Sequence, residues 1–494
     1  MAWGTLMIAL SIMLIAPIVL AIVQALGGHR ASAERWNTLV TLTIFLASVW
    51  LYSTVLRWGA QSWCGELFHI DALNGLFLTL TCLVAWTTSI FSGPYMRVEL
   101  DRGRLSPARL RLYHSVFAFF LGTMLLALSV NNMGLMWVAM EAATLSTVLM
   151  VSLYRTPASL EAAWKYFILC GVGIAQALFG LILLYLAADR VIGGGEQTLL
   201  WTHLWQIRSH LDAHIMAIAF IFLLLGWGTK MGLVPLHGWL PDAHAEGPTP
   251  ISAVLCGLLL NVATYAMLRC KILADGVLPA HWSDHLLLVL GVLTLVVAVL
   301  AILVQKDVKR LFAYSSIEHM GLITLALSLS GVWTHMAALL HMTLHALIKS
   351  AIFFSAGHAA QKVGSQKIAD LRALVRVSPR IGWSLLIGVL AILGLPPFGM
   401  FRSEFMIFSS LLAQQPSLLP LVALALLLAL LGLLGPTQSM TLGQEAPTHM
   451  RILPYRPRRL PLLVHLGLAA FLGLYLPPVV LQAYQQAAII LGGS

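Results

Sequence analysis

The sequence contains little charge. Only 10% of its 494 residues are Asp, Glu, Lys or Arg, whereas 59% are hydrophobic, and the mean hydropathy is +0.88. A soluble protein of this length needs far more charge to cover its surface. The composition therefore places the chain in a membrane.

Cysteine is also scarce, and no two cysteines have the Cys-x-x-Cys spacing. The five are Cys64, Cys82, Cys170, Cys256 and Cys270. This pattern argues against iron–sulfur clusters and structural zinc, and it offers no disulfide framework. We therefore expect no cofactor, and any redox chemistry must take place on a partner. A removable signal peptide is also not expected, because the first apolar run, Thr5 to Leu26, lacks a basic n-region and an Ala-x-Ala site.

What the sequence does contain is a series of long apolar runs. At about 18 to 25 residues each, they are long enough for a helix to cross a hydrocarbon core of roughly 30 Å. They predict an all-α polytopic membrane protein with about fourteen transmembrane helices. The expected spans are residues 5–26, 37–56, 72–92, 113–130, 132–154, 163–187, 213–235, 249–271, 284–304, 311–330, 332–360, 381–410, 417–434 and 462–485. No loop between them is long enough for a soluble domain, so we expect a single membrane domain over 1–494.

The basic residues are distributed unevenly among the loops. Of the 29 Lys and Arg residues, 21 follow odd-numbered spans, five follow even-numbered spans, and Lys230, Lys349 and Arg402 lie inside spans. Under the positive-inside rule, the odd loops are cytoplasmic and both termini are periplasmic in a bacterial inner membrane. The pI of about 9.6 is therefore a topology signal and does not indicate nucleic-acid binding.

Glycine and proline interrupt two of the spans. The first interruption is Gly226–Pro235, which contains Lys230, and the second is Leu393–Phe405, which contains Glu404. Broken backbone survives at membrane depth only where it is buried in protein or lines a wet cavity. The two spans are five apart, as expected for a transporter built from inverted repeats. The alternative is a pair of packing kinks.

A further ionisable residue, Glu141, lies in the middle of the span at 132–154. A charge there costs roughly 2.5–3.5 kcal/mol, so it is tolerated when it is paired or functional. Lys230 is its expected partner. If the carboxylate moved away, the lysine could release its proton, as a proton relay requires. The alternative is a static structural ion pair.

Three ionisable residues, His341, His345 and Lys349, recur every four positions and share one face of a helix. Imidazoles transfer protons in the physiological range, and we expect His319 to join them. Glu318 should point elsewhere, because adjacent helical residues diverge by about 100°. Although i,i+4 histidines have metal-ligand spacing, no carboxylate or cysteine ligand lies nearby in sequence, so we expect no metal.

Two histidines, His237 and His244, flank Leu240-Pro241-Asp242 at the cytoplasmic end of the span at 213–235. They are candidates for a proton entrance. The alternative is that they are merely solvated at the membrane interface.

The same residues carry a recognisable pattern. Residues 228–253, 313–321 and 396–405 resemble the signatures of the antiporter-like subunits of respiratory complex I and of membrane-bound hydrogenases. Within that family, residues 159–166 and the short chain look most like component F of hydrogenase-4. The resemblance implies two inverted five-helix repeats, with discontinuous helices 7 and 12. We place the repeats at 113–271 and 284–434, between an N-terminal part (1–112) and a C-terminal part (435–494).

The resemblance also implies a chain of buried charges, in which Glu141, Lys230 and Glu404 match the family's key positions. One position departs from the pattern, because Asn261 stands where complex I relatives usually have a central lysine. Asparagine cannot hold a transferable charge. We hypothesise that Lys349 is the central relay instead.

These features predict a proton-translocating, energy-coupling subunit of a redox complex of the hydrogenase-4, formate hydrogenlyase or NADH-quinone oxidoreductase type. Its expected partners are other membrane and peripheral subunits, the lipid bilayer and protons, with Na⁺ as the alternative ion. One alternative function is a subunit of an Mrp-type cation/proton antiporter. Another is an energy-coupling partner in ion-driven uptake of inorganic carbon.

Overall fold

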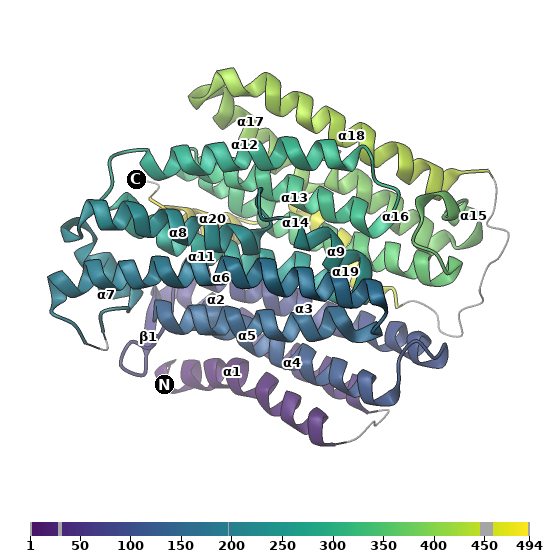
Figure 1. The fold of residues 1–494 in the computed structure, drawn as a ribbon, viewed down its shortest axis with the longest axis horizontal. Helices are drawn as coiled ribbons and strands as arrows, with labels where there is room; N and C mark the ends of the chain where they lie inside the picture. The colour runs from purple at the N-terminus through teal and green to yellow at the C-terminus, as the bar shows by residue number, and fades with distance from the viewer. Residues whose placement is uncertain (1, 28–31, 196, 445–457, 493–494) are drawn as a thin grey trace.

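The computed structural model describes residues 2–27, 32–195, 197–444 and 458–492. Within these residues the chain folds almost entirely into helices that run side by side across the molecule (Figure 1). Eleven of the described helices are long and apolar enough to cross a membrane, or twelve if one bent pair counts as a single span. The all-α membrane class is confirmed, whereas the count of fourteen stays a prediction.

The first part of the chain forms seven helices and a small hairpin. They are α1 (Ala2–Leu26), α2 (Ala33–Trp58), β1 (Gln61–Trp63), β2 (Phe68–Ile70), α3 (Ala72–Asp101), α4 (Pro107–Ser129), α5 (Met133–Val151), α6 (Pro157–Ile192) and α7 (Trp201–Ile207). The antiparallel hairpin and the short α7 were not predicted, because both lie in loops between apolar runs.

The rest of the chain is helical and contains the broken spans. Its elements are α8 (Ala213–Met231), α9 (Trp239–Glu246), α10 (Thr249–Val254), a π-helical turn (Leu255–Leu259), α11 (Leu260–Asp275), α12 (Trp282–Ile302), α13 (Val308–Leu327), α14 (Val332–Val363), α15 (Leu374–Val377), α16 (Pro379–Ile392), α17 (Gly399–Gln414), α18 (Leu419–Leu442), α19 (Leu460–Leu474) and α20 (Pro478–Ile490). Short 3₁₀ turns lie at Ser152–Tyr154, Arg208–His210, Ile368–Asp370 and Pro416–Leu418.

Both predicted interruptions are present. α8 ends where Gly232 adopts a φ of +78°, and α16 ends just before Gly394, at a φ of +66°. Glycine occupies these left-handed positions at little steric cost. A third interruption was not predicted: α19 and α20 meet at 87°, where the sequence suggested one continuous span over 462–485. Pro477 and Pro478 lie at this bend, and proline cannot continue a helical hydrogen-bond ladder.

α14 lies at the centre of the bundle. At 1.5 Å per residue its 32 residues span about 48 Å. Every residue from Thr334 to Gln361 is buried, so this helix is surrounded by protein on all sides. The histidine and lysine positions singled out on 332–360 therefore face other helices and not lipid.

Both ends of the described chain lie at the end of the bundle that carries the β hairpin and α7, with α1 along one edge and α18 along the opposite edge (Figure 1). Arg269 and Lys271, expected in a loop on that side, instead lie buried in α11. Three arginines counted in the opposite loops, Arg30, Arg451 and Arg456, lie outside the described residues.

Candidate functional site

The first buried cluster surrounds Lys230 in the last turn of α8. Its side chain is 0% exposed and donates a hydrogen bond to the hydroxyl of Thr144 on α5. The thiol of Cys170 on α6 is a second partner, and the ammonium lies 5.4 Å from the ring centroid of Tyr166. The last turn of a helix is also a favourable place for a cation, because its carbonyl groups carry partial negative charge.

Glu141, the expected partner of Lys230, is not in direct contact with it. The nearest polar partner of the ammonium is Thr144, one helical turn beyond Glu141 on α5. The Glu141 side chain is half-buried, and its Oε2 atom is buried with no hydrogen-bond partner among the described residues. The alternative of a static, directly contacting ion pair is therefore not what this structure shows, whereas the partnership of the two charges stays a prediction. The two charges interact electrostatically, with Thr144 in reach of both.

A second cluster joins α13, α14 and α17. His319 Nδ1 lies 3.1 Å from His341 Nε2, and His341 Nδ1 lies 3.0 Å from the hydroxyl of Ser403. The ring of His345 is 5.6 Å from that of His319. Glu404 approaches His319 and His341 so closely that one ligand atom from each of the three lies within 4.8 Å of the others. The structure thus brings together His319, His341, His345 and Glu404.

Glu318 belongs to the same cluster, contrary to expectation. Its Oε2 atom lies 3.3 Å from His319 Nε2, while Oε1 has no partner among the described residues. The argument from a 100° divergence applies to the Cβ atoms. Side chains on adjacent positions can still bend toward one another, and both Glu318 and His319 are buried here.

On α14, Lys349 lies about one helical turn beyond His345 and about two turns beyond His341. It is 0% exposed and donates to the backbone carbonyl of Phe312 on α13 over 3.0 Å. Cys256, in the π-helical turn, is an electrostatic neighbour and lies 3.8 Å from His345 Nε2. Single π-helical turns often mark functional positions in helices. Lys349 is therefore held against the irregular turn that precedes Asn261.

Glu404 lies against the break between α16 and α17. A Cβ atom at Gly394 would lie only 2.0 Å from Glu404 Oε2, so the glycine leaves room for the carboxylate. Glu404 is half-buried. The helix break at Gly394 therefore provides the space that the Glu404 carboxylate occupies.

The two histidines near α9 have different surroundings. His237, in the segment between α8 and α9, is half-buried, and its ring lies 6.4 Å from that of Tyr314. His244, on α9, is fully buried and stacked on Phe353, and neither ring nitrogen has a hydrogen-bond partner among the described residues. His244 is thus not a solvated interfacial residue.

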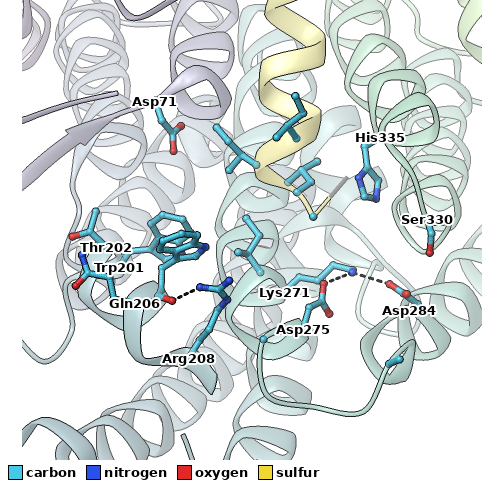
Figure 2. A pocket seen from close by; sticks show the side chains of 18 of the residues that line it. Asp71, Trp201, Thr202, Gln206, Arg208, Lys271, Asp275, Asp284, Ser330 and His335 are labelled. Carbon is cyan, nitrogen blue, oxygen red and sulfur yellow. Dashed lines mark hydrogen bonds and ion pairs between the residues drawn. The ribbon is translucent and has the colours of Figure 1, made fainter. Parts of the chain in front are cut away.

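Sequence reasoning missed a cavity of about 880 Å³ at the end of the bundle near the β hairpin, with several ionisable residues among those that line it (Figure 2). Lys271 reaches into it and pairs with Asp275 and Asp284, each at 2.7 Å. His335, two turns before His341 on α14, also lines it. The only available signal was the presence of Lys271 and Asp275 at i,i+4 spacing.

A buried ion pair lies beside this cavity. Arg269 Nη2 is 2.7 Å from Asp71 Oδ2, and Asp71 also accepts hydrogen bonds from Leu73 and Asn74 as the N-cap of α3. Burial raises the pKa of Asp71, but the Arg269 guanidinium opposes this effect and the net pKa lies below its usual value. This pair ties α11 to the start of α3.

The fold and these clusters define a class: a multi-pass helical membrane protein with broken helices and ionisable side chains deep in its bundle. The chain belongs to the family described as NADH:quinone oxidoreductase/Mrp antiporter, TM, whose model matches residues 130–432. That range includes every site residue proposed from the sequence.

The individual relatives agree with this assignment. The chain is 50% identical over 413 residues to a hydrogenase-4 component F homolog from Methylacidiphilum infernorum, which covers 83% of this chain and 85% of the relative. Three further curated relatives are longer, and the matched region makes up 50% to 55% of their length.

Two solved structures share the fold. One is a chain of the membrane-bound sulfane sulfur reductase, an archaeal respiratory membrane complex (TM-score 0.85, 24% identity, 98% of this chain and 97% of that one). The other is a chain of the Mrp complex from Dietzia sp. DQ12-45-1b (TM-score 0.84, 19% identity, 97% and 96%). Because the scores are nearly equal, the fold does not distinguish a redox complex from an antiporter.

Proposed function

We propose that this chain is a proton-translocating, energy-coupling subunit of a multisubunit membrane redox complex of the hydrogenase-4 type. The observation that carries the proposal is a pair of fully buried lysines, Lys230 and Lys349, that contact no carboxylate within 4.0 Å in the described part of the chain. A buried charge is costly unless it is paired or functional. Hydroxyl, thiol and carbonyl groups can solvate an ammonium while leaving its proton free to move.

The proposed route begins at the Lys230 cluster. A movement of Glu141 changes the free energy of the proton on Lys230, because the two charges interact electrostatically without a direct contact. Leu240 and Ile317 are the side chains nearest to Gly232, and both are apolar. Transfer from Lys230 toward Glu318 and Lys349 therefore needs transient water at the break.

The second half of the route runs along α14. Protons pass toward Glu404 through Lys349, His345, His341 and His319. The cavity lined by His335, at the end of the bundle near the β hairpin, provides an opening for this half of the route. His237 and His244 are proposed as the entrance on the other side. We further propose a bacterial inner membrane, with both termini periplasmic and the more basic loops cytoplasmic.

The test compares Lys349→Ala with Lys349→Arg in membrane vesicles, with proton movement followed by a pH-sensitive dye. Alanine removes the transferable proton and arginine holds it permanently, so both should reduce translocation at least 10-fold. Lys367→Ala, an exposed lysine in the loop after α14, is the matched control. Unchanged translocation in both Lys349 variants would overturn the central role of this residue.

The second candidate is a subunit of an Mrp-type cation/proton antiporter, favoured by the equal likeness to the Mrp chain. Co-purification of the chain with an iron–sulfur or nickel subunit supports the redox complex. Na⁺-dependent proton exchange without any redox partner supports the antiporter and overturns the first proposal.

A further inference from the structure

The helices α13, α14 and α17 bring two imidazoles and one carboxylate together. His319 Nδ1 and His341 Nε2 are 3.1 Å apart, and one ligand atom from each of His319, His341 and Glu404 lies within 4.8 Å of the other two. In a tetrahedral site with bonds of about 2.0–2.1 Å, neighbouring ligand atoms are about 3.3 Å apart. The separation of the two nitrogens therefore suits a shared metal ion as well as a hydrogen bond.

The opposite nitrogen of each ring has its own anchor. His319 Nε2 lies 3.3 Å from a Glu318 carboxylate oxygen, and His341 Nδ1 lies 3.0 Å from the Ser403 hydroxyl. Histidines that bind metals almost always donate their second ring N–H to a carboxylate, a carbonyl or water, which fixes the orientation of the ring. In each ring one nitrogen thus lies close to the other ring, while the opposite nitrogen is held by its own anchor.

The ligand types favour one class of ion. Two imidazole nitrogens and a carboxylate suit Zn²⁺ and other late divalent metals, whereas Na⁺, Mg²⁺ and Ca²⁺ prefer all-oxygen sites. The carboxylates of Glu404 and Glu318 can together offset a 2+ charge. Glu404 is half-buried beside the Gly394 break, so it is the one of the three ligands that the protein does not fully enclose.

We propose that His319, His341 and Glu404 form a binding site for a divalent transition-metal ion of the Zn²⁺ class, and that the bound ion blocks proton transfer through these residues. A third ligand could not be predicted from sequence spacing, because Glu404 is far from both histidines along the chain. Metal binding is independent of the proposed function, whereas the block rests on it.

The binding experiment uses the full chain with its co-purifying subunits, stripped with a chelator. The exposed pair His281 and His285 has i,i+4 spacing and can bind metal at the surface, so the reference protein carries His281→Gln and His285→Gln. Zn²⁺ is measured by equilibrium dialysis. Co²⁺, which absorbs strongly in the visible range when tetrahedral, reports the geometry.

In the reference protein we expect one tight Zn²⁺ and a tetrahedral Co²⁺ spectrum. His341→Gln or Glu404→Gln should remove both, and Ser403→Ala should weaken binding by about 10- to 100-fold. Unchanged binding in the His341 and Glu404 variants means an adventitious ion only and overturns the proposal. So does an octahedral Co²⁺ spectrum, or no binding at all.

The inhibition experiment follows proton translocation against free Zn²⁺ in the same proteins. If the site blocks the route, the inhibitory concentration should rise in Ser403→Ala by the same factor as the dissociation constant. If Zn²⁺ binds this site but translocation continues, the metal site stands, whereas both the block and the relay through His319 and His341 are overturned.

Discussion

Gly394→Ala tests the link between the second helix break and Glu404 without removing the carboxylate. At Gly394 the φ of +66° is left-handed, which costs a residue with a Cβ atom roughly 1–2 kcal/mol. The new Cβ would lie 2.0 Å from Glu404 Oε2, whereas ordinary contacts begin near 3.4 Å. Because the carboxylate ends a flexible side chain, it should move more than 1 Å away while the backbone stays in place.

We expect the Gly394→Ala protein to fold but to translocate protons more slowly. The free energy of unfolding should fall by about 1–2 kcal/mol, measured by thermal unfolding in detergent. A displacement of 1 Å at a reacting group can cost about 100-fold in rate, so translocation should fall by roughly 10- to 100-fold. Gly171→Ala, in α6 with open space around it, is the control and should be neutral or slightly stabilising. A folded Gly394→Ala protein with normal translocation would refute the reasoning.

Two further substitutions test the buried contacts. Thr144→Val leaves Lys230 without its hydroxyl acceptor and should lower the free energy of unfolding by about 1–3 kcal/mol, while Thr144→Ser should not; equal thermal stability of the two contradicts the contact. Asp71→Asn leaves Arg269 buried and unpaired and should cost about 3–5 kcal/mol in chemical denaturation. The folded pKa of Asp71 is lowered, so the stability from this pair is present above the unfolded carboxyl pKa and is lost as pH falls through the folded value. Asp71→Asn should therefore remove part of the acid sensitivity of unfolding, and an unchanged pH profile would argue against the pair.

The helices could be predicted because each run of apolar residues matches the thickness of the bilayer, a local property of the sequence. The span expected at 332–360 is α14, Val332–Val363, with nearly the same bounds. The bend between α19 and α20 has a local signal in Pro477 and Pro478, but the end of α19 also meets a distant part of the chain. A Cβ at Gly473, near the end of α19, would lie 2.1 Å from the carbonyl oxygen of Pro397, so α19 ends against the break of another span. No local pattern reveals such nesting.

The same distinction applies to the site. His341, His345 and Lys349 could be aligned from sequence because they share one helix, and helical spacing alone fixes their common face. The hydrogen bond of Lys230 to the Thr144 hydroxyl could not be predicted, because the choice between that hydroxyl and the Glu141 carboxylate depends on how α5 and α8 pack. The pairing of Arg269 with Asp71 joins residues 198 positions apart, beyond the reach of any local rule.

The surroundings of Asn261 bear on the proposal that Lys349, and not a residue at position 261, is the central relay. The Asn261 Nδ2 atom donates to the carbonyl of Gly257, and its Oδ1 is buried without a partner among the described residues. Asn261 can therefore accept a hydrogen bond from water but cannot store a proton. α14 presses directly on this segment, since a Cβ at Gly257 would lie 3.0 Å from the Ser350 hydroxyl. α14 thus packs on the π-helical turn of the preceding span, which is consistent with the proposal that Lys349 on α14 supplies the transferable charge that Asn261 cannot hold.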